Sequence, residues 1–272
     1  MKLAYQTITW GGLVSDPAGV TSIKDLYYLA NGSTEEALRD IAGAGYEGFE
    51  LFDGNLMQYA GRERELVTVM EKLNLEMVAV YSGANFVYGE ILEEELSKIK
   101  KVAQLGAHLG ATHLVVGGGA VRTTGVAEED YQRLADGLEK VVDLADQAGM
   151  VASYHPHLGT CVESPEQIEK VFLHTGINFC PDTAHLEAGG GDPAELISKY
   201  GDRIRYVHLK DYEDGNFLPL GRGKQDFPQI LRALEKIGYD GWITVELDSY
   251  AGSPKEAAQI SKAFLKEKLS VA

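Results

Sequence analysis

Histidine and carboxylate side chains end four apolar runs in the second half of the chain. These runs are Tyr154–His157, Cys180–His185, Val207–Asp211 and Val245–Asp248. Each run is typical of a buried strand, so the polar groups should gather where strands stop. Strands that deliver imidazoles and carboxylates from one edge of a sheet can build a site for a divalent metal ion. The sequence therefore favours an enzyme.

Residues two apart on a strand share a face, so each strand end can direct two polar groups the same way. His155 with His157, His208 with Lys210, and Glu246 with Asp248 are such pairs. One group from each of the four strand ends would supply mixed imidazole and carboxylate ligands. That mixture suits Mn, Co, Fe or Zn better than a thiolate site or an all-oxygen calcium site. We expect one such metal site.

Eight short apolar runs alternate with amphipathic helical stretches along the whole chain. The expected strands are Leu3–Thr9, Gly48–Phe52, Glu76–Ser82, His113–Gly117, Val151–His155, Asn178–Asp182, Arg205–Leu209 and Trp242–Leu247. Runs that are apolar on both faces are typical of buried parallel strands. Residues 1–272 are therefore expected to form a single (β/α)8 TIM barrel of the α/β class. An open doubly wound sheet is the alternative, but no Gly-x-Gly-x-x-Gly opens a helix after a strand.

A TIM barrel carries its active site at the C-terminal ends of its strands. The second, third and fourth expected strands also end in groups that suit such a site: Glu50 and Asp53, Ser82 and Asn85, and the glycines 117–119. Each polar residue also has a structural interpretation. Glu50 could pair with a basic side chain, Asp211 or Asp248 could cap a loop, and His113 is expected to be a core residue. Four consecutive strands with ligand-type ends nevertheless favour a metal site.

The charge and composition of the chain limit the classes of partner that it could bind. The formal net charge is −16, with no Lys- or Arg-rich cluster, which disfavours nucleic acid as a partner. Two cysteines cannot form a disulfide framework, and no run is long enough to span a membrane. The N-terminus lacks the features of a signal peptide. We expect a cytoplasmic protein that acts on a small molecule and can form a homo-oligomer.

Five motifs carry a resemblance to a known family over nearly the whole chain. They are Tyr-His-Pro-His-Leu-Gly-Thr (154–160), Pro-Asp-Thr-Ala-His-Leu (181–186), Arg-Tyr-Val-His-Leu-Lys-Asp (205–211), Leu-Gly-Arg-Gly (220–223) and Gly-Tyr-Asp-Gly-Trp-Ile-Thr-Val-Glu-Leu-Asp (238–248). The chain resembles the xylose isomerase-like superfamily, the sugar isomerase, epimerase and endonuclease IV group. Within this superfamily, the five motifs are most similar to those of the inosose dehydratases.

The resemblance implies a ligand set and a substrate site. It implies that Asp182, His208 and Glu246 bind the metal, together with His155 or His157. The predicted metal set is His155, Asp182, His208 and Glu246, with His157 as the alternative to His155. It also implies that His185 and Asp211 line the site, and we expect Glu50 and Arg222 to contact substrate with them.

The strand that ends at His155 departs from the isomerases, which usually carry glutamate there. Isomerases and epimerases of this group typically move a proton with two glutamates, so losing one favours a different reaction. Dehydration beside a carbonyl needs a base, an acid and a Lewis acid. We expect His155, His157, Lys210 and Glu246 to do this chemistry on a keto-polyol, with 2-keto-myo-inositol (scyllo-inosose) giving a cyclohexane dione. A sugar or hydroxypyruvate isomerase or epimerase is the alternative.

Overall fold

Eight parallel strands form the centre of the protein in the computed structural model, which describes residues 1–11 and 27–269. The strands neighbour one another in the order β6-β5-β4-β3-β2-β1-β10-β7. Their bounds are β1 (Lys2–Gln6), β2 (Gly48–Phe52), β3 (Glu76–Ala84), β4 (His113–Gly118), β5 (Val151–Tyr154), β6 (Asn178–Phe179), β7 (Val207–Leu209) and β10 (Trp242–Val245). All eight expected strands are present at the predicted places.

The ends of this sheet meet at β6 and β7, which closes the ring. Parallel bridges join Phe179 to Ile204 and Asp182 to His208. The amide of His208 also donates to the carbonyl of Pro181 at 2.9 Å. The predicted TIM barrel is thus confirmed, and it brings the end of β6 against the end of β7.

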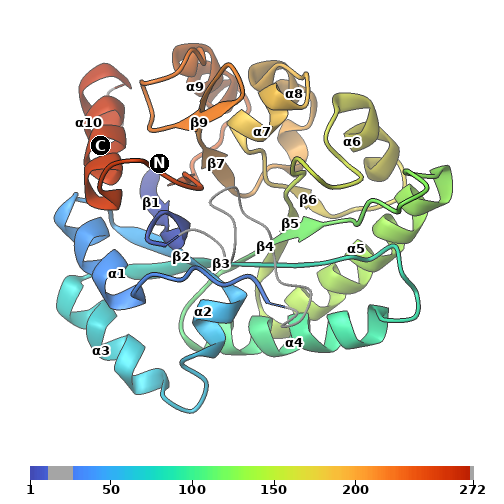
Figure 1. The fold of residues 1–272 in the computed structure, drawn as a ribbon, viewed down its shortest axis with the longest axis horizontal. Helices are drawn as coiled ribbons and strands as arrows, with labels where there is room; N and C mark the ends of the chain where they lie inside the picture. Colours follow the sequence, from blue (N-terminus) through green and yellow to red (C-terminus); the bar gives the residue numbers. More distant parts are fainter. Residues whose placement is uncertain (12–26, 270–272) are drawn as a thin grey trace.

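Helices surround the strands on the outside (Figure 1). The larger ones are α1 (Thr34–Gly43), α3 (Glu63–Leu73), α4 (Leu92–His108), α5 (Glu128–Ala148), α6 (Pro165–Phe172), α8 (Pro193–Lys199), α9 (Phe227–Lys236) and α10 (Pro254–Leu269). Shorter elements are α2 (Asp53–Met57), α7 (Thr183–Ala188) and the 3-10 turns Thr7–Thr9 and Gly201–Arg203. Across the part of the chain that the structure describes, no helix is long and apolar enough to cross a membrane.

The helices form and pack for reasons that are visible in the sequence. Helix α9 buries Ile230, Leu231 and Leu234, which recur at helical spacing, and leaves Gln229 and Arg232 exposed. Each such apolar side chain contributes roughly 1.5–3 kcal/mol when it is buried. The hydroxyl of Ser33 accepts from the amide of Glu36 at 3.3 Å, so it caps α1.

The space inside the barrel is filled by a second, smaller apolar cluster. It includes Ala4, Tyr81, Val115, Cys180 and Tyr206. Cys180 and Tyr206 each precede a predicted metal ligand by two residues, so they lie one layer nearer the N-terminal ends of the strands. This layer closes the barrel beneath the polar strand ends, which are therefore cut off from solvent on that side.

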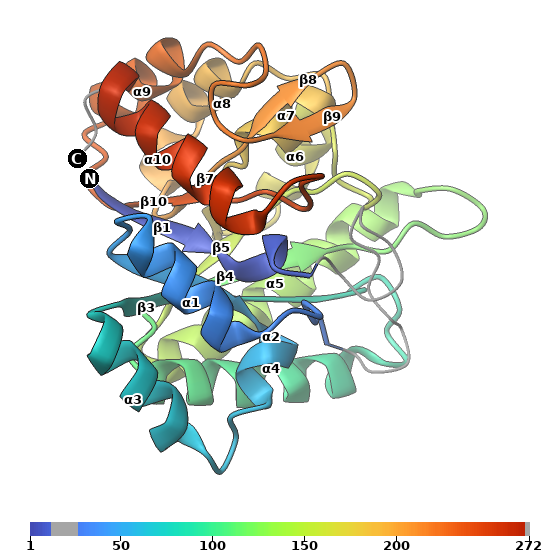
Figure 2. The ribbon, with the colours of Figure 1, turned by 60° about the vertical axis from the view of Figure 1, so that its left-hand side comes forward.

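Three details differ from the expected elements. The first strand ends at Gln6 instead of Thr9, because the Gln6 side chain accepts from the Ile8 amide and starts a 3-10 turn. The β6 strand ends at Phe179, and the Cys180 amide makes the last bond to β5 by donating to the Tyr154 carbonyl at 2.8 Å. An unexpected hairpin, β8 (Asp211–Glu213) and β9 (Asn216–Leu218), follows β7. Figure 2 shows this hairpin close to α7.

Candidate metal centre

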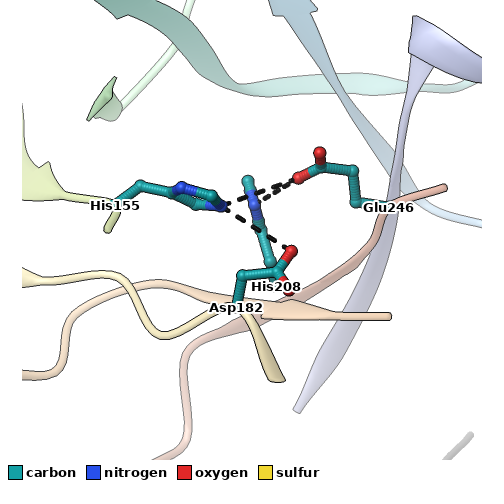
Figure 3. Close-up of side chains that lie close together, drawn as sticks. All are labelled: His155, Asp182, His208 and Glu246. Carbon is teal, nitrogen blue, oxygen red and sulfur yellow. Dashed lines mark ion pairs between the residues drawn. The ribbon is translucent and has the colours of Figure 1, made fainter. Parts of the chain in front are cut away.

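Four polar side chains come together inside the C-terminal end of the barrel. They follow or belong to β5, β6, β7 and β10, and they are His155, Asp182, His208 and Glu246. One ligand atom from each lies within 4.8 Å of the others, and all four are buried. Figure 3 shows the four side chains converging from different strands. The fold thus brings the four predicted metal residues to one place.

The ligand atoms that face the centre of this cluster lack hydrogen-bond partners. His155 Nε2 lies 3.6 Å from Asp182 Oδ2 and 4.0 Å from Glu246 Oε2, and His208 Nδ1 lies 2.5 Å from Glu246 Oε2. Each of these buried atoms lacks a hydrogen-bond partner of suitable geometry. Unsatisfied polar atoms are costly to bury, whereas one cation would serve all four. The two imidazoles and two carboxylates therefore fit a divalent ion such as Mn, Co, Fe or Zn.

Asp182 is positioned by the helix that it begins. Its Oδ1 accepts from the amides of Ala184 and His185, each at 2.9 Å, and so caps α7. The two bonds hold the carboxylate in one orientation and leave Oδ2 for the cluster. Burial alone would raise the pKa of Asp182, but the nearby Lys210 and His155 outweigh it and lower that pKa. The carboxylate is therefore ionised, as a metal ligand must be.

His208 is oriented by Glu50 of β2. Its Nε2 lies 3.0 Å from Glu50 Oε2, which leaves Nδ1 facing Glu246. Burial alone would lower the pKa of His208, but Glu50 and then Glu246 raise it to about 10. A carboxylate behind a ligating histidine fixes its tautomer and increases its basicity. Glu50, predicted to contact substrate, is thus paired with a basic side chain, the alternative that the sequence left open.

Lys210 lies beside the cluster and is fully buried. Its Nζ is 2.8 Å from Asp248 Oδ2, 3.0 Å from Glu246 Oε1, 3.2 Å from His185 Nε2 and 3.4 Å from Asp182 Oδ2. Burial opposes the charge, but Asp182, Asp248 and Glu246 raise the pKa of Lys210 well above its usual value. Lys210 in turn, with His208, lowers the pKa of Glu246 well below its usual range despite burial. The site holds a fixed ammonium group.

Two further imidazoles, His157 and His185, lie next to the four clustered side chains. Their ring centroids are 3.8 Å apart. Burial, and then a neighbouring imidazole, lowers the pKa of each, that of His185 well below 6.5. The Nδ1 of His157 donates to the carbonyl of Leu158 at 2.6 Å. The neutral His157 ring therefore carries its lone pair on Nε2 and can accept a proton.

Of the remaining predicted substrate residues, Asp211 begins β8 and Arg222 lies on the loop that follows the hairpin. Asp211 accepts from the amides of Tyr212, Gly221 and Gly223, each at 2.8 Å. These bonds tie residues 221–223 to the end of β7, which supports the loop-capping interpretation of Asp211. Arg222 lies on the same loop with an exposed side chain. A substrate contact by either residue stays a prediction.

Other strand ends form a separate cluster. Asp53 Oδ2 accepts from the hydroxyl of Ser82 at 2.7 Å and lies 3.1 Å from Lys98 Nζ of α4. Tyr81, the neighbour of Ser82, faces the interior and contacts His155, so Ser82 faces outward. The alternation along the strands thus separates these groups from the metal cluster.

Two residues of the site have roles that the sequence did not predict. Asp248, expected to share a face with Glu246 or to cap a loop, bonds Lys210. Phe217 of β9 lies with its ring centroid 4.9 Å from Lys210 Nζ and 4.8 Å from the ring of His185. The turn Asp214-Gly215, with positive φ at both residues, is a signal that could have predicted the hairpin carrying Phe217.

Comparison with known proteins places the chain in a family. A family model described as a xylose isomerase-like TIM barrel matches residues 38–268. An inosose dehydratase from Clostridium botulinum is 30% identical over 275 residues, which cover 87% of this chain and 90% of that protein. One from Lacticaseibacillus casei is 29% identical over 273 residues, with 87% and 90% covered.

A solved structure supports the fold. The IOLI protein with a zinc atom has a TM-score of 0.76 and 19% identity over 99% of this chain and 98% of that one. The predicted resemblance is confirmed, as is the expectation of an enzyme of the dehydratase or isomerase/epimerase type. The chain belongs to the family of xylose isomerase-like TIM barrels.

Proposed function

We propose that this chain is a metal-dependent dehydratase that removes water from a keto-polyol, with scyllo-inosose as the substrate and a cyclohexane dione as the product. The observation that carries the proposal is the free Nε2 of His157, a neutral base beside the buried cluster of His155, Asp182, His208 and Glu246. The names of the relatives from Clostridium botulinum and Lacticaseibacillus casei support the same reaction.

The metal is held by His155, Asp182, His208 and Glu246 in this proposal. When bound, it supplies a Lewis acid that polarises the substrate carbonyl. The donor set accommodates Mn, Co, Zn or Fe. Glu50 bonds Nε2 of His208 and so orients the ring with Nδ1 toward the metal. The buried layer of Cys180 and Tyr206 beneath the cluster excludes water from that side.

The chain's own residues handle the protons. His157 accepts the α-proton of the ketone at Nε2, and the electron pair of that C–H bond moves into the enolate. The hydroxyl on the next carbon takes this proton from His157 and leaves as water while the electron pair of the enolate forms the C=C bond, and the enol product tautomerises to the dione. Lys210, a fixed ammonium 3.0 Å from Glu246 and 2.8 Å from Asp248, stabilises negative charge on the enolate or the leaving oxygen.

The base is what separates this reaction from the isomerase alternative. Proton transfer by two glutamates would require a second uncommitted carboxylate beside Glu246. Asp182 caps α7, Glu50 is bonded to His208, and Asp248 is bonded to Lys210. Each nearby carboxylate is thus already engaged, which favours an imidazole base and water loss.

Turnover of a metal-loaded sample tests the proposal. The protein is stripped of metal, reloaded with Mn, Co, Zn or Fe in separate samples, and incubated with scyllo-inosose. We expect an absorbing dione and the loss of water by mass spectrometry. Interconversion of free ketoses without water loss would favour the sugar isomerase or epimerase alternative. No turnover of any inosose with any of the metals would contradict the dehydratase.

We also propose a compartment and a class of partner for the protein. Cys161 and Cys180 are both buried and unpaired, which fits a reducing compartment such as the cytoplasm. A small polyol is the partner that we propose, and the −16 charge argues against nucleic acid.

A further inference from the structure

A second group of potential metal ligands lies next to the first. One ligand atom from each of His157, His185 and Asp248 lies within 4.8 Å of the other two. His157 and Asp248 each follow a residue of the first cluster, His155 and Glu246, by two positions. Residues two apart share a face of a strand, so the second group forms a layer one step further toward the C-terminal rim.

The ammonium of Lys210 lies between the two layers. It contacts Asp248 and His185 of the outer layer at 2.8 and 3.2 Å, and Glu246 and Asp182 of the inner one at 3.0 and 3.4 Å. Lys210 itself follows His208 by two positions, directly after the end of β7. The end of β7 therefore places the Lys210 ammonium where the neighbouring strand ends place potential metal ligands.

The atoms around Nζ are those that a metal ion would use. An ammonium group has only donors, so the nitrogen of His185 that faces it must present its lone pair. Glu246 Oε1 and Asp248 Oδ2 likewise accept from Nζ, and Asp182 Oδ2 lies 3.4 Å from it as an ion-pair partner. Three carboxylate oxygens and an imidazole nitrogen suit a divalent transition metal as well as they suit an ammonium.

The charges of the buried groups lead to the same conclusion. Four buried carboxylates, Glu50, Asp182, Glu246 and Asp248, surround the two layers. One divalent ion and the Lys210 ammonium leave a single net negative charge when the imidazoles are neutral. A second divalent ion beside the ammonium would make the site positive, whereas one that replaced the ammonium would balance it. Uncompensated buried charge is costly.

We propose that His157, His185 and Asp248 form a second cation site, and that Lys210 occupies it as a built-in substitute for a second metal ion. The ammonium keeps the centre to one metal ion and leaves the Nε2 of His157 uncoordinated. Replacing Lys210 with a small neutral residue should therefore turn the centre into a two-metal site.

The test counts metal ions per chain. Metal-free wild type and Lys210→Ala are titrated with Zn²⁺ or Mn²⁺ by calorimetry, and metal content after dialysis is measured by elemental analysis. We expect one equivalent for the wild type and two for Lys210→Ala, a twofold gain. The double variant Lys210→Ala, Asp248→Asn should return to one, because it loses a ligand of the outer layer. Lys210→Met should also bind one, since its side chain keeps the space filled.

The outcomes separate this inference from the proposed function. One equivalent in both the wild type and a folded Lys210→Ala would overturn the inference and leave the metal-dependent dehydratase intact. Two equivalents in the wild type would overturn it as well, because the ammonium would then not exclude a second ion. If Lys210→Ala folds only with metal, its refolding should require two equivalents. Refolding that is complete at one would refute the second site.

Discussion

The imidazole of His208 is held by Glu50, whose Oε2 lies 3.0 Å from His208 Nε2 across the interior of the barrel. The two residues come from β7 and β2, which are separated in the sheet by β10 and β1. This contact leaves Nδ1 as the nitrogen that faces Glu246 and Asp182. A carboxylate from one side of the barrel thus determines which ring nitrogen the other side presents.

Glu50→Gln should therefore weaken metal binding. The variant keeps the shape of the side chain but loses the charge that fixes the tautomer of His208, so we expect roughly a 10- to 100-fold loss of metal affinity. Calorimetric titration with Zn²⁺ or Mn²⁺ measures it. Glu76→Gln, at an exposed position at the start of β3, is the control. Equal affinities in the two variants would show that Glu50 does not orient His208.

Asp182→Asn should separate the two tasks of Asp182. An asparagine can still cap α7 through its side-chain oxygen, so the unfolding temperature of the metal-free protein should stay close to that of the wild type. The variant loses the anionic ligand, and most of the bound metal should be lost. Asp182→Ala removes the cap as well and should cost about 1 kcal/mol more in stability. Full metal content in Asp182→Asn combined with His208→Ala would contradict the ligand assignment.

His155 and His157 should differ in what their loss does. His157→Gln removes the proposed base, so kcat should fall about 100-fold or more while metal content is unchanged. His155→Gln should lower the metal content, because His155 lies in the inner cluster. Metal analysis and steady-state kinetics on the same samples distinguish the two. The opposite result, with metal lost only in His157→Gln, would exchange the roles.

Asp211→Ala should free the loop that follows the hairpin. The carboxylate accepts from the amides of Gly221 and Gly223 at 2.8 Å, and hydrogen bonds to a charged group contribute about 1.5–3 kcal/mol each. Hydrogen exchange at these two amides should become at least about tenfold faster. Asp240→Ala, at an exposed position before β10, is the control. Unchanged protection would leave substrate binding as the role of Asp211.

The stability of the protein should fall in mild acid because of His113. Burial lowers the pKa of this residue from 6.5 to about 4, so the unfolded chain takes up a proton before the folded one does. The folded state therefore loses stability as the pH falls from 6.5 to about 4, by up to about 3 kcal/mol. His113→Phe keeps the ring beside Tyr206 and removes the titration. Denaturant unfolding of both proteins at pH 7 and pH 4.5 should show the smaller loss in the variant.

Much of the barrel could be predicted because parallel strands have a clear local signature. Runs such as 113–117 and 242–247 are apolar on both faces, and all eight strands are found at their predicted positions. The residues of the metal cluster were also accessible, since strand ends meet at one rim of a barrel. The pattern does not predict how far along or on which face of a strand end a side chain lies. It could therefore not decide which of His155 and His157 joins the metal cluster, or that Asp53 lies apart from Glu50.

Tertiary structure decided these points through contacts between segments far apart in the chain. His155 lies with Asp182 and His208 only because β5, β6 and β7 are neighbours in the closed ring. The position of Lys210 between Asp248 and His185 is likewise a matter of packing in three dimensions. The sequence alone determined the types of polar group and the strands that carry them, because these depend on local periodicity. Only the folded barrel decided which group faces which, because strand closure and register determine the distances between their atoms.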